Sequence, residues 1–124
     1  MKKEKRLTIA FDVDDCLLLP SVATGLDIDT PNYDNIDIFR YFQAQGHDMV
    51  VWSGSGMDYA SRWAEKLGLR PCIVLEKRRY DTFEPDICFD DCDVDLAKVN
   101  IKVKRLNNSI SRKEWNKKGA KDEG

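Results

Sequence analysis

Short runs of apolar and β-branched residues recur along the chain, and polar or turn-forming residues separate them. The runs cover residues 7–11, 49–53, 72–76, 86–90 and 100–105. The first four have continuously apolar centres, which is typical of parallel strands buried on both faces. The fifth alternates Ile101 and Val103 with Lys102 and Lys104, as an edge strand with one face in water does. The pattern therefore predicts a parallel sheet of about five strands.

Helical periodicity fills the two gaps between the first three runs. In the first gap, Asp34 is placed to cap a helix that ends at Gly46. The apolar face of this helix carries Ile38, Phe39 and Phe42. A second helix is predicted in the next gap, with an apolar face formed by Ala60, Trp63, Ala64 and Leu67. Alternating strands and helices imply right-handed crossovers and a three-layer, Rossmann-like α/β fold.

The remaining segments are irregular. Residues 17–30 follow neither period for long and predict a loop or a small hairpin. The connection between the third and fourth runs, "KRRYDTFEP", is short and charged. We therefore expect one domain over residues 1–106, followed by a basic tail or short helix over residues 107–124.

The composition fits a single compact domain. The chain has 124 residues, of which 42% are hydrophobic, and this supplies one core. No apolar stretch approaches the roughly 18 residues of a membrane helix, and the first residues make a poor signal peptide, so we expect a cytoplasmic protein. The net charge is −2, but Lys and Arg gather at both ends. These ends indicate either a polyanionic partner or solvated termini.

The cysteines, the histidine and two tryptophans have structural interpretations. Cys16, Cys72, Cys88 and Cys92 include no Cys-x-x-Cys pair, and the chain has one histidine. Buried, reduced thiols are therefore favoured over a metal site or a disulfide framework. His47 lies between a predicted helix and a predicted strand, which suits a turn residue. Trp52 and Trp63 fit the core better than a substrate platform.

Acidic residues gather where the predicted strands end. Asp12 and Asp14 follow the first strand, and Asp90 and Asp91 end the fourth. Ligands of an open parallel sheet bind beyond the carboxyl ends of its strands, so these four carboxylates are expected at one edge. Neighbouring acids repel each other and resist desolvation unless a cation compensates them. Such hard oxygen ligands suit Mg²⁺, which keeps waters that a phosphate can replace.

A candidate anion site follows the second predicted strand. Ser53 ends that strand, and "SGSG" leads from it into the second helix. A helix N-terminus built of small residues presents backbone amides, and a serine hydroxyl adds one more donor. Ser53 and Gly54 are therefore candidate phosphate-binding residues. A cation site that faces an anion site predicts a phosphate site.

Together, the strand ends resemble the motifs of haloacid dehalogenase (HAD) superfamily phosphatases. "IAFDVDD" is similar to the first motif, an apolar strand ending in Asp-x-Asp, and "MVVWS" to the second, a strand ending in Ser or Thr. "DICFDD" is similar to the fourth motif, which ends in paired acids. Their order, spacing and strand context agree over residues 7–95. The resemblance implies a HAD-like hydrolase domain.

The resemblance also implies a role for each motif residue. Asp12 would be the nucleophile that forms an aspartyl-phosphate, and Asp14 would be the general acid and then the general base. Mg²⁺ would be held by Asp12, the backbone carbonyl of Asp14 and Asp90, with Asp91 assisting. Ser53 would hold a phosphoryl oxygen. The function implied is a Mg²⁺-dependent phosphomonoesterase.

At three points the sequence either departs from the motifs or allows more than one residue for a motif position. The third motif of the family is a lysine that neutralises the nucleophile and the phosphate; Lys77 is the first choice, with Arg78 and Arg79 as alternatives. Cys16 replaces the threonine that usually follows the first acids. Asp95 is an alternative outer acid for the fourth motif.

The family often adds a cap domain over the site, and this chain lacks the length for one. Neither residues 17–30 nor the connection after the third strand holds a folded insertion. An open site implies a large phosphorylated substrate, or closure by a partner or a second subunit. The basic ends favour nucleotides or nucleic-acid ends over a phosphoprotein or small metabolite. The alternative class is a non-catalytic phosphate- or partner-binding module, and the presence of both Asp12 and Asp14 favours the enzyme.

Overall fold

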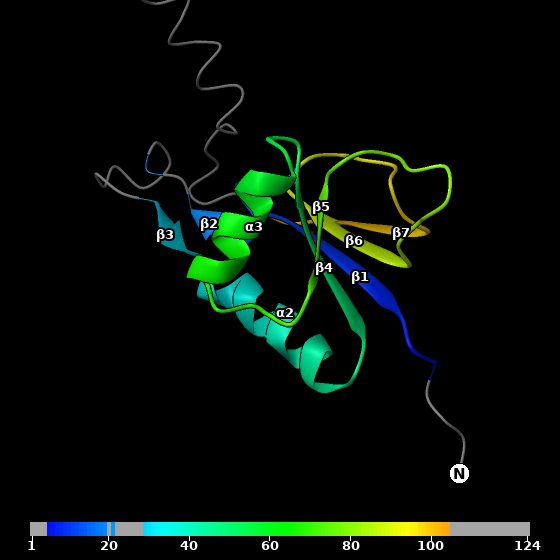
Figure 1. Cartoon of the computed structure of the whole chain (residues 1–124), viewed down its shortest axis with the longest axis horizontal. Helices are drawn as coiled ribbons and strands as arrows, with labels where there is room; N and C mark the ends of the chain where they lie inside the picture. Colours follow the sequence, from blue (N-terminus) through cyan, green and yellow to red (C-terminus); the bar gives the residue numbers. More distant parts are fainter. Residues whose placement is uncertain (1–4, 20, 22–28, 105–124) are drawn as a thin grey trace, which may run out of the picture.

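A computed structural model describes residues 5–19, 21 and 29–104 of the chain. Its centre is a five-stranded sheet in the order β5-β4-β1-β6-β7, in which all neighbouring strands are parallel (Figure 1). The strands are β1 (Thr8–Asp12), β4 (Asp48–Ser53), β5 (Ile73–Glu76), β6 (Ile87–Asp90) and β7 (Val99–Lys102). Each overlaps one of the apolar runs, and the predicted Rossmann-like α/β class is confirmed. Within the described residues, no cap domain covers the sheet.

Two helices, α2 (Tyr33–Ala44) and α3 (Met57–Lys66), lie on one side of the sheet (Figure 1). In α3, Ala60 and Ala64 are buried, as predicted. The buried face of α2 is different from the predicted one, because Ile36 and Phe39 are buried while Ile38 is 38% exposed. Phe39 packs edge-on against the ring of Phe11 in the core. Because successive residues of a helix are turned by about 100° around its axis, Ile38 points away from that contact.

The start of α2 also differs from the prediction. Asn32, not Asp34, is the N-cap residue, it makes no side-chain cap bond, and Asp34 lies in the first turn. The helix starts there because a small antiparallel hairpin of β2 (Leu18–Leu19) and β3 (Thr30–Pro31) ends directly before it. The hairpin confirms the prediction for residues 17–30 within its described part. Asp34 in the first turn still complements the positive end of the helix dipole.

The connections after β5 and β6 cross the opposite side of the sheet. The chain first moves from β1 to β4 and β5, and then returns to the other side of β1 with β6 and β7. Since crossovers between parallel strands are right-handed, this reversal sends the later connections over the other face. Side chains from the two connections pack there against β1, β4 and β6, namely Tyr80, Phe83, Val94, Leu96 and Ala97. The sheet thus lies between a layer of helices and a layer of loops.

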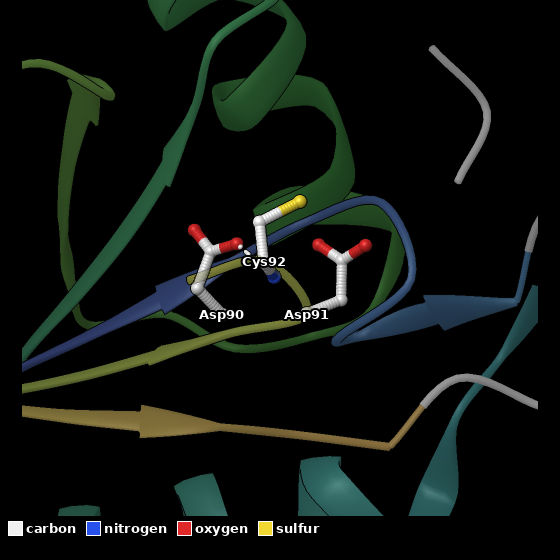
Figure 2. A group of neighbouring side chains, drawn as sticks. All are labelled: Asp90, Asp91 and Cys92. Atoms are coloured by element: carbon white, nitrogen blue, oxygen red, sulfur yellow. Dashed lines mark hydrogen bonds between the residues drawn. The ribbon is translucent and has the colours of Figure 1, made fainter. Parts of the chain in front are cut away.

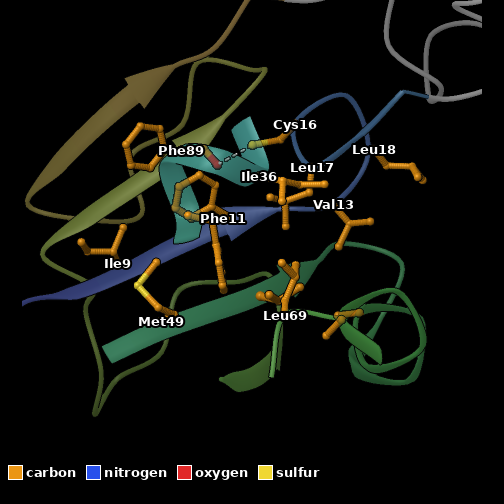
Figure 3. Packing of buried hydrophobic residues seen from close by; sticks show 14 residues of the cluster. Ile9, Phe11, Val13, Cys16, Leu17, Leu18, Ile36, Met49, Leu69 and Phe89 are labelled. Atoms are coloured by element: carbon orange, nitrogen blue, oxygen red, sulfur yellow. Dashed lines mark hydrogen bonds between the residues drawn. The ribbon is translucent and has the colours of Figure 1, made fainter. Parts of the chain in front are cut away.

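Phe11 lies at the centre of the larger core, between the sheet and the helices (Figure 3). Its ring stacks on Phe89 of β6 with a centroid distance of 4.4 Å and meets Phe39 of α2 edge-on at 5.3 Å. Trp52 is fully buried on the opposite face and Trp63 is partly buried, so both are core residues as predicted. The packing of Phe11 against a strand and a helix fixes the end of β1, where Asp12 follows.

The two edges of the sheet are β5 and β7. The position of β5 corrects the prediction that its run is buried on both faces, since Ile73 is 45% exposed. For β7 the prediction of an edge strand is confirmed, although all four of its residues are exposed rather than one face alone. Apolar content did not identify β5 as an edge because it does not specify the order of the strands.

The cysteines and the histidine have structural positions. All four cysteines are free; Cys16 and Cys88 are buried, whereas Cys72 and Cys92 are only partly buried. His47 lies in the turn before β4, where Nδ1 accepts a hydrogen bond of 3.0 Å from the backbone N–H of Leu7. The tail predicted over residues 107–124 lies outside the described residues. Neither helix of the described part has the length and apolar character that crossing a membrane requires.

Candidate active site

The candidate site lies beyond the carboxyl end of β1, where the order of the strands reverses. Ligands of doubly wound sheets bind in the crevice at such a point. Asp12 is the last residue of β1 and Asp90 the last of the neighbouring β6, and they are only 4% and 0% exposed. Since Phe11 pairs with Phe89 in the register of the two strands, Asp12 and Asp90 are neighbours on the loop side of the sheet. The structure thus brings together the ends of the two strands that resemble the first and fourth motifs.

Lys77 supplies the positive charge between these two carboxylates. Its Nζ lies 3.0 Å from Oδ2 of Asp90 and 3.4 Å from Oδ1 of Asp12. Lys77 directly follows β5, and its backbone N–H donates a bond of 2.8 Å to the carbonyl of Ser53, which fixes it against the end of β4. The lysine therefore reaches the site from an edge strand.

The two arginines that competed with Lys77 lie elsewhere. The guanidinium of Arg78 stacks over the ring of Tyr80 at 4.5 Å and is 3.8 Å from Glu76. Arg79 is paired with Asp95, and both side chains are mostly exposed. Among the three candidates, the geometry therefore favours Lys77 as the cation of the third motif. It also favours Asp91, which is 4% exposed, over Asp95 as the second acid of the fourth motif.

The two buried carboxyl groups of the site, Asp12 and Asp90, have raised pKa values although Lys77 lies beside them. Desolvation, followed by the nearby Asp90, raises the pKa of Asp12 well above its ordinary value even though Lys77 opposes this. Desolvation also raises the pKa of Asp90, again against the effect of Lys77. Burial alone would lower the pKa of Lys77, but Asp12 and Asp90 outweigh it and raise that pKa. One lysine thus compensates the buried carboxylates only in part.

Asp12→Asn is expected to stabilise the fold when no divalent ion is present. Near pH 8 the free energy of unfolding should rise by about 1–3 kcal/mol, because Asn removes a buried charge that costs more than its pair with Lys77 returns. A carboxyl whose pKa is raised in the folded state binds its proton more tightly there, so the wild type gains stability as the pH falls through that pKa. The advantage of the variant should therefore shrink toward pH 5 or so.

Denaturant unfolding in a chelating buffer at both pH values measures this difference. The control is Asp37→Asn at an exposed position of α2, which should change the free energy of unfolding by less than about 0.5 kcal/mol at either pH. A wild type that is more stable than Asp12→Asn near pH 8 would contradict this description of the site.

Asp14 lies in the loop after β1 and is held by a residue that the sequence did not indicate. The hydroxyl of Tyr59, from α3, donates a hydrogen bond of 2.7 Å to Oδ1 of Asp14. The chain turns sharply just after Asp14, because Asp15 has a φ of 62° and its N–H bonds to the carbonyl of Leu18 at 2.9 Å. Aspartate tolerates this left-handed conformation better than most residues do. The chain thus turns at Asp15, directly after the candidate site.

Ser53 and Gly54 lie at the end of β4, beside Lys77. Ser53 is 3% exposed, and its Oγ accepts a bond of 3.0 Å from the N–H of Ser55. Its carbonyl accepts another from the N–H of Gly56, at 3.1 Å. A Cβ added to Gly54 would lie 3.9 Å from Cε of Lys77, so the loop passes close to the lysine. The amides of Ser55 and Gly56 are thus used within the turn, and phosphate binding by Ser53 and Gly54 stays a prediction.

Asp90, Asp91 and Cys92 form a group whose side chains point to the same side of the loop after β6 (Figure 2). One potential ligand atom from each lies within 4.8 Å of the others. The N–H of Cys92 donates a bond of 2.9 Å to Oδ1 of Asp90, which orients that carboxylate. The sequence favours a buried, reduced thiol over a metal ligand for Cys92, and in the structure this thiol is free and only partly buried.

Cys16, which replaces the usual threonine of the first motif, is a core residue. Its side chain is fully buried on the helix side of the sheet, and Sγ lies 3.7 Å from the carbonyl of Phe89 as a donor (Figure 3). Burial, with the nearby Asp12, raises the pKa of this thiol well above its ordinary value. The protonated thiol is therefore an inert packing group that ties the loop after β1 to β6.

Comparisons with protein-family models, with curated proteins and with solved structures find no match to this chain.

Proposed function

We propose that the protein is a cytoplasmic, Mg²⁺-dependent phosphomonoesterase that acts through an aspartyl-phosphate on Asp12. The observation that carries the proposal is the contact of one lysine, Lys77, with two buried carboxylates that end neighbouring strands, Asp12 and Asp90. Desolvation raises the pKa of both carboxyl groups, which makes their ionised forms costly to the fold, and such buried clusters are typical of functional sites. The resemblance of the motifs to HAD phosphatases supports the same assignment.

The donor set fits Mg²⁺. Asp12 and Asp90 are 4% and 0% exposed and share the contact of one lysine, Lys77, and desolvation raises the pKa of both carboxyl groups, so a divalent cation would add the positive charge that favours their ionised forms. Asp12 and Asp90 would hold the ion, with the backbone carbonyl of Asp14 and with Asp91 assisting. When bound, Mg²⁺ supplies charge neutralisation and polarises the phosphoryl oxygens.

The chain's own residues account for the steps of the reaction. A carboxylate oxygen of Asp12 attacks phosphorus while the bond to the leaving oxygen breaks, and Asp14 donates the proton that this oxygen needs. Asp14 then accepts a proton from the water that attacks the aspartyl-phosphate, which releases phosphate and restores Asp12. Lys77 favours the ionised form of Asp12 and compensates the charge of the phosphoryl group. Ser53 and Gly54 bind phosphoryl oxygens.

The substrate is proposed to be a large phosphorylated molecule such as a nucleotide or the end of a nucleic acid. No cap domain lies over the site in the described part of the chain, so nothing there encloses a small metabolite. The segments rich in Lys and Arg at both ends of the sequence favour a polyanion.

Removal of divalent ions is expected to abolish turnover of an aryl phosphate. The rate with Mg²⁺ should be at least about 100-fold higher than the rate in chelator, because such an ion stabilises the charge of the transition state by several kcal/mol. The measurement is the release of phenol or nitrophenol from the wild-type chain in chelator and in a titration of Mg²⁺.

The contrary outcomes separate the classes of function. Turnover that is unchanged by the chelator would contradict the role of the metal. A wild type that is inactive with Mg²⁺ on aryl phosphates, nucleotides and phosphorylated oligonucleotides would favour the phosphate- or partner-binding module instead.

A further inference from the structure

Tyr59 lies early in α3, and its hydroxyl contacts Asp14. The hydrogen bond to Oδ1 is 2.7 Å long and joins residues 45 positions apart in the sequence. The ring of Tyr59 packs against the core between the helices and the sheet, which fixes the direction of the hydroxyl. A rigid helix thus holds a carboxylate that belongs to a loop.

Asp14 needs such support if it transfers protons. It is only partly buried, and the terminal torsion of an aspartate side chain is broad, so the backbone alone does not orient the carboxylate. An acid that donates a proton in the transition state must hold one oxygen toward the reacting group. A hydrogen bond to one carboxyl oxygen restricts the rotation of the carboxyl plane, whether or not the other oxygen carries the proton.

We propose that Tyr59 is a positioning residue for proton transfer by Asp14, an inference that rests on the proposed function. In the first step the bond from Asp12 to phosphorus forms, the bond to the leaving oxygen breaks, and the proton moves from Asp14 to that oxygen. In the second step water attacks phosphorus, its proton moves to Asp14, and the bond to Asp12 breaks. Tyr59 keeps its own proton in both steps and acts by holding Oδ1.

The need for a proton from Asp14 depends on the leaving group. If Tyr59 positions Asp14, the loss of rate on removing its hydroxyl should be larger for a poorer leaving group. Phenolate is a poor leaving group that needs the proton as the bond breaks, whereas 4-nitrophenolate leaves as a stable anion. Tyr59→Phe keeps the ring and its packing but removes the donor to Asp14. The variant should therefore lose activity selectively on the substrate with the poorer leaving group.

The experiment compares kcat/KM for phenyl phosphate and 4-nitrophenyl phosphate with saturating Mg²⁺. Tyr59→Phe is expected to lose about tenfold on phenyl phosphate and less than about twofold on the nitro compound. Asp14→Asn should show the same selectivity with a larger loss on phenyl phosphate, about 10²-fold or more. The control is Tyr41→Phe, which alters a tyrosine of α2 that is 62% exposed and should leave both substrates unchanged. Thermal unfolding checks that Tyr59→Phe is folded.

The results separate the positioning role of Tyr59 from the proposed phosphatase activity. Equal losses on the two substrates, or no loss on either, would overturn the positioning role while the phosphatase itself stands. A wild type that hydrolyses neither substrate would overturn the proposed function and the role of Tyr59 with it.

Discussion

Asp12→Asn is expected to lower kcat/KM for an aryl phosphate by at least about 10³-fold. Asn has nearly the shape of Asp but presents an amide, which is a poor nucleophile and carries no charge. The loss cannot be attributed to unfolding, because the same change relieves a buried charge and should stabilise the chain without metal. Initial rates with 4-nitrophenyl phosphate and saturating Mg²⁺ measure it.

The matched control for this variant is Asp37→Asn, which changes an exposed aspartate of α2 to the same residue. It should retain the wild-type rate within about twofold. If Asp12→Asn kept more than a tenth or so of the wild-type rate, water rather than Asp12 would be the attacking group, and the proposed mechanism would be wrong.

Lys77→Met is expected to reduce kcat/KM by about 10²–10³-fold and to destabilise the fold. Methionine keeps much of the length of the side chain but leaves Asp12 and Asp90 without the ammonium that contacts both. Near pH 8 without metal, the free energy of unfolding should fall by about 2–4 kcal/mol. The fall should be smaller near pH 5, because protonation of the two carboxylates removes the charge that Lys77 compensates.

Arg78→Met is the control for Lys77→Met, since it removes the adjacent positive charge, which lies on Tyr80 instead of the carboxylates. It should leave the rate within about threefold and the free energy of unfolding within about 1 kcal/mol. The combination of Asp12→Asn with Lys77→Met should recover part of the lost stability, because one buried charge fewer remains. Larger effects from Arg78→Met than from Lys77→Met would assign the third motif to Arg78.

The positions of the strand ends were predictable from the sequence because they follow from apolar runs. A continuous apolar run is typical of a strand in a parallel sheet, and a parallel sheet places every carboxyl end at one edge. The sequence therefore predicts one site for Asp12 and Asp90, and the structure places them on adjacent strands, where Lys77 contacts both.

Features that depend on tertiary contacts could not be predicted in the same way. The buried face of α2 is set by the packing of Phe39 on Phe11, and the exposed edge of β5 by the strand order, neither of which the local pattern contains. The bond from Tyr59 to Asp14 joins two segments that are not adjacent in the sequence. Tyr59 precedes Trp63 by about one helical turn, so the sequence indicates that Tyr59 lies at the border of the predicted apolar face but does not indicate its contact with Asp14.

Cys16 departs from the resembled motif, and its place in the fold gives a physical reason for the cysteine. In the sequence it replaces a threonine without explanation, whereas in the fold it fills a fully enclosed position next to Phe89. The thiol packs there as a small apolar group, and its weak donor lies against the carbonyl of Phe89. The loop after β1 is thus held by packing as well as by its turn.

The central claim is that Asp12 becomes phosphorylated, and trapping the acyl phosphate tests it most directly. The chain is mixed with 4-nitrophenyl phosphate and Mg²⁺, quenched within a turnover, and reduced with borohydride, which converts an aspartyl-phosphate to homoserine. Peptide mass spectrometry then locates the modified position. Asp14→Asn should accumulate more of the intermediate, because this substrate forms it without an acid while hydrolysis lacks its base. The account predicts homoserine at position 12 in the wild type and more of it in Asp14→Asn; substrate turnover with Asp12 unmodified in both proteins would contradict it.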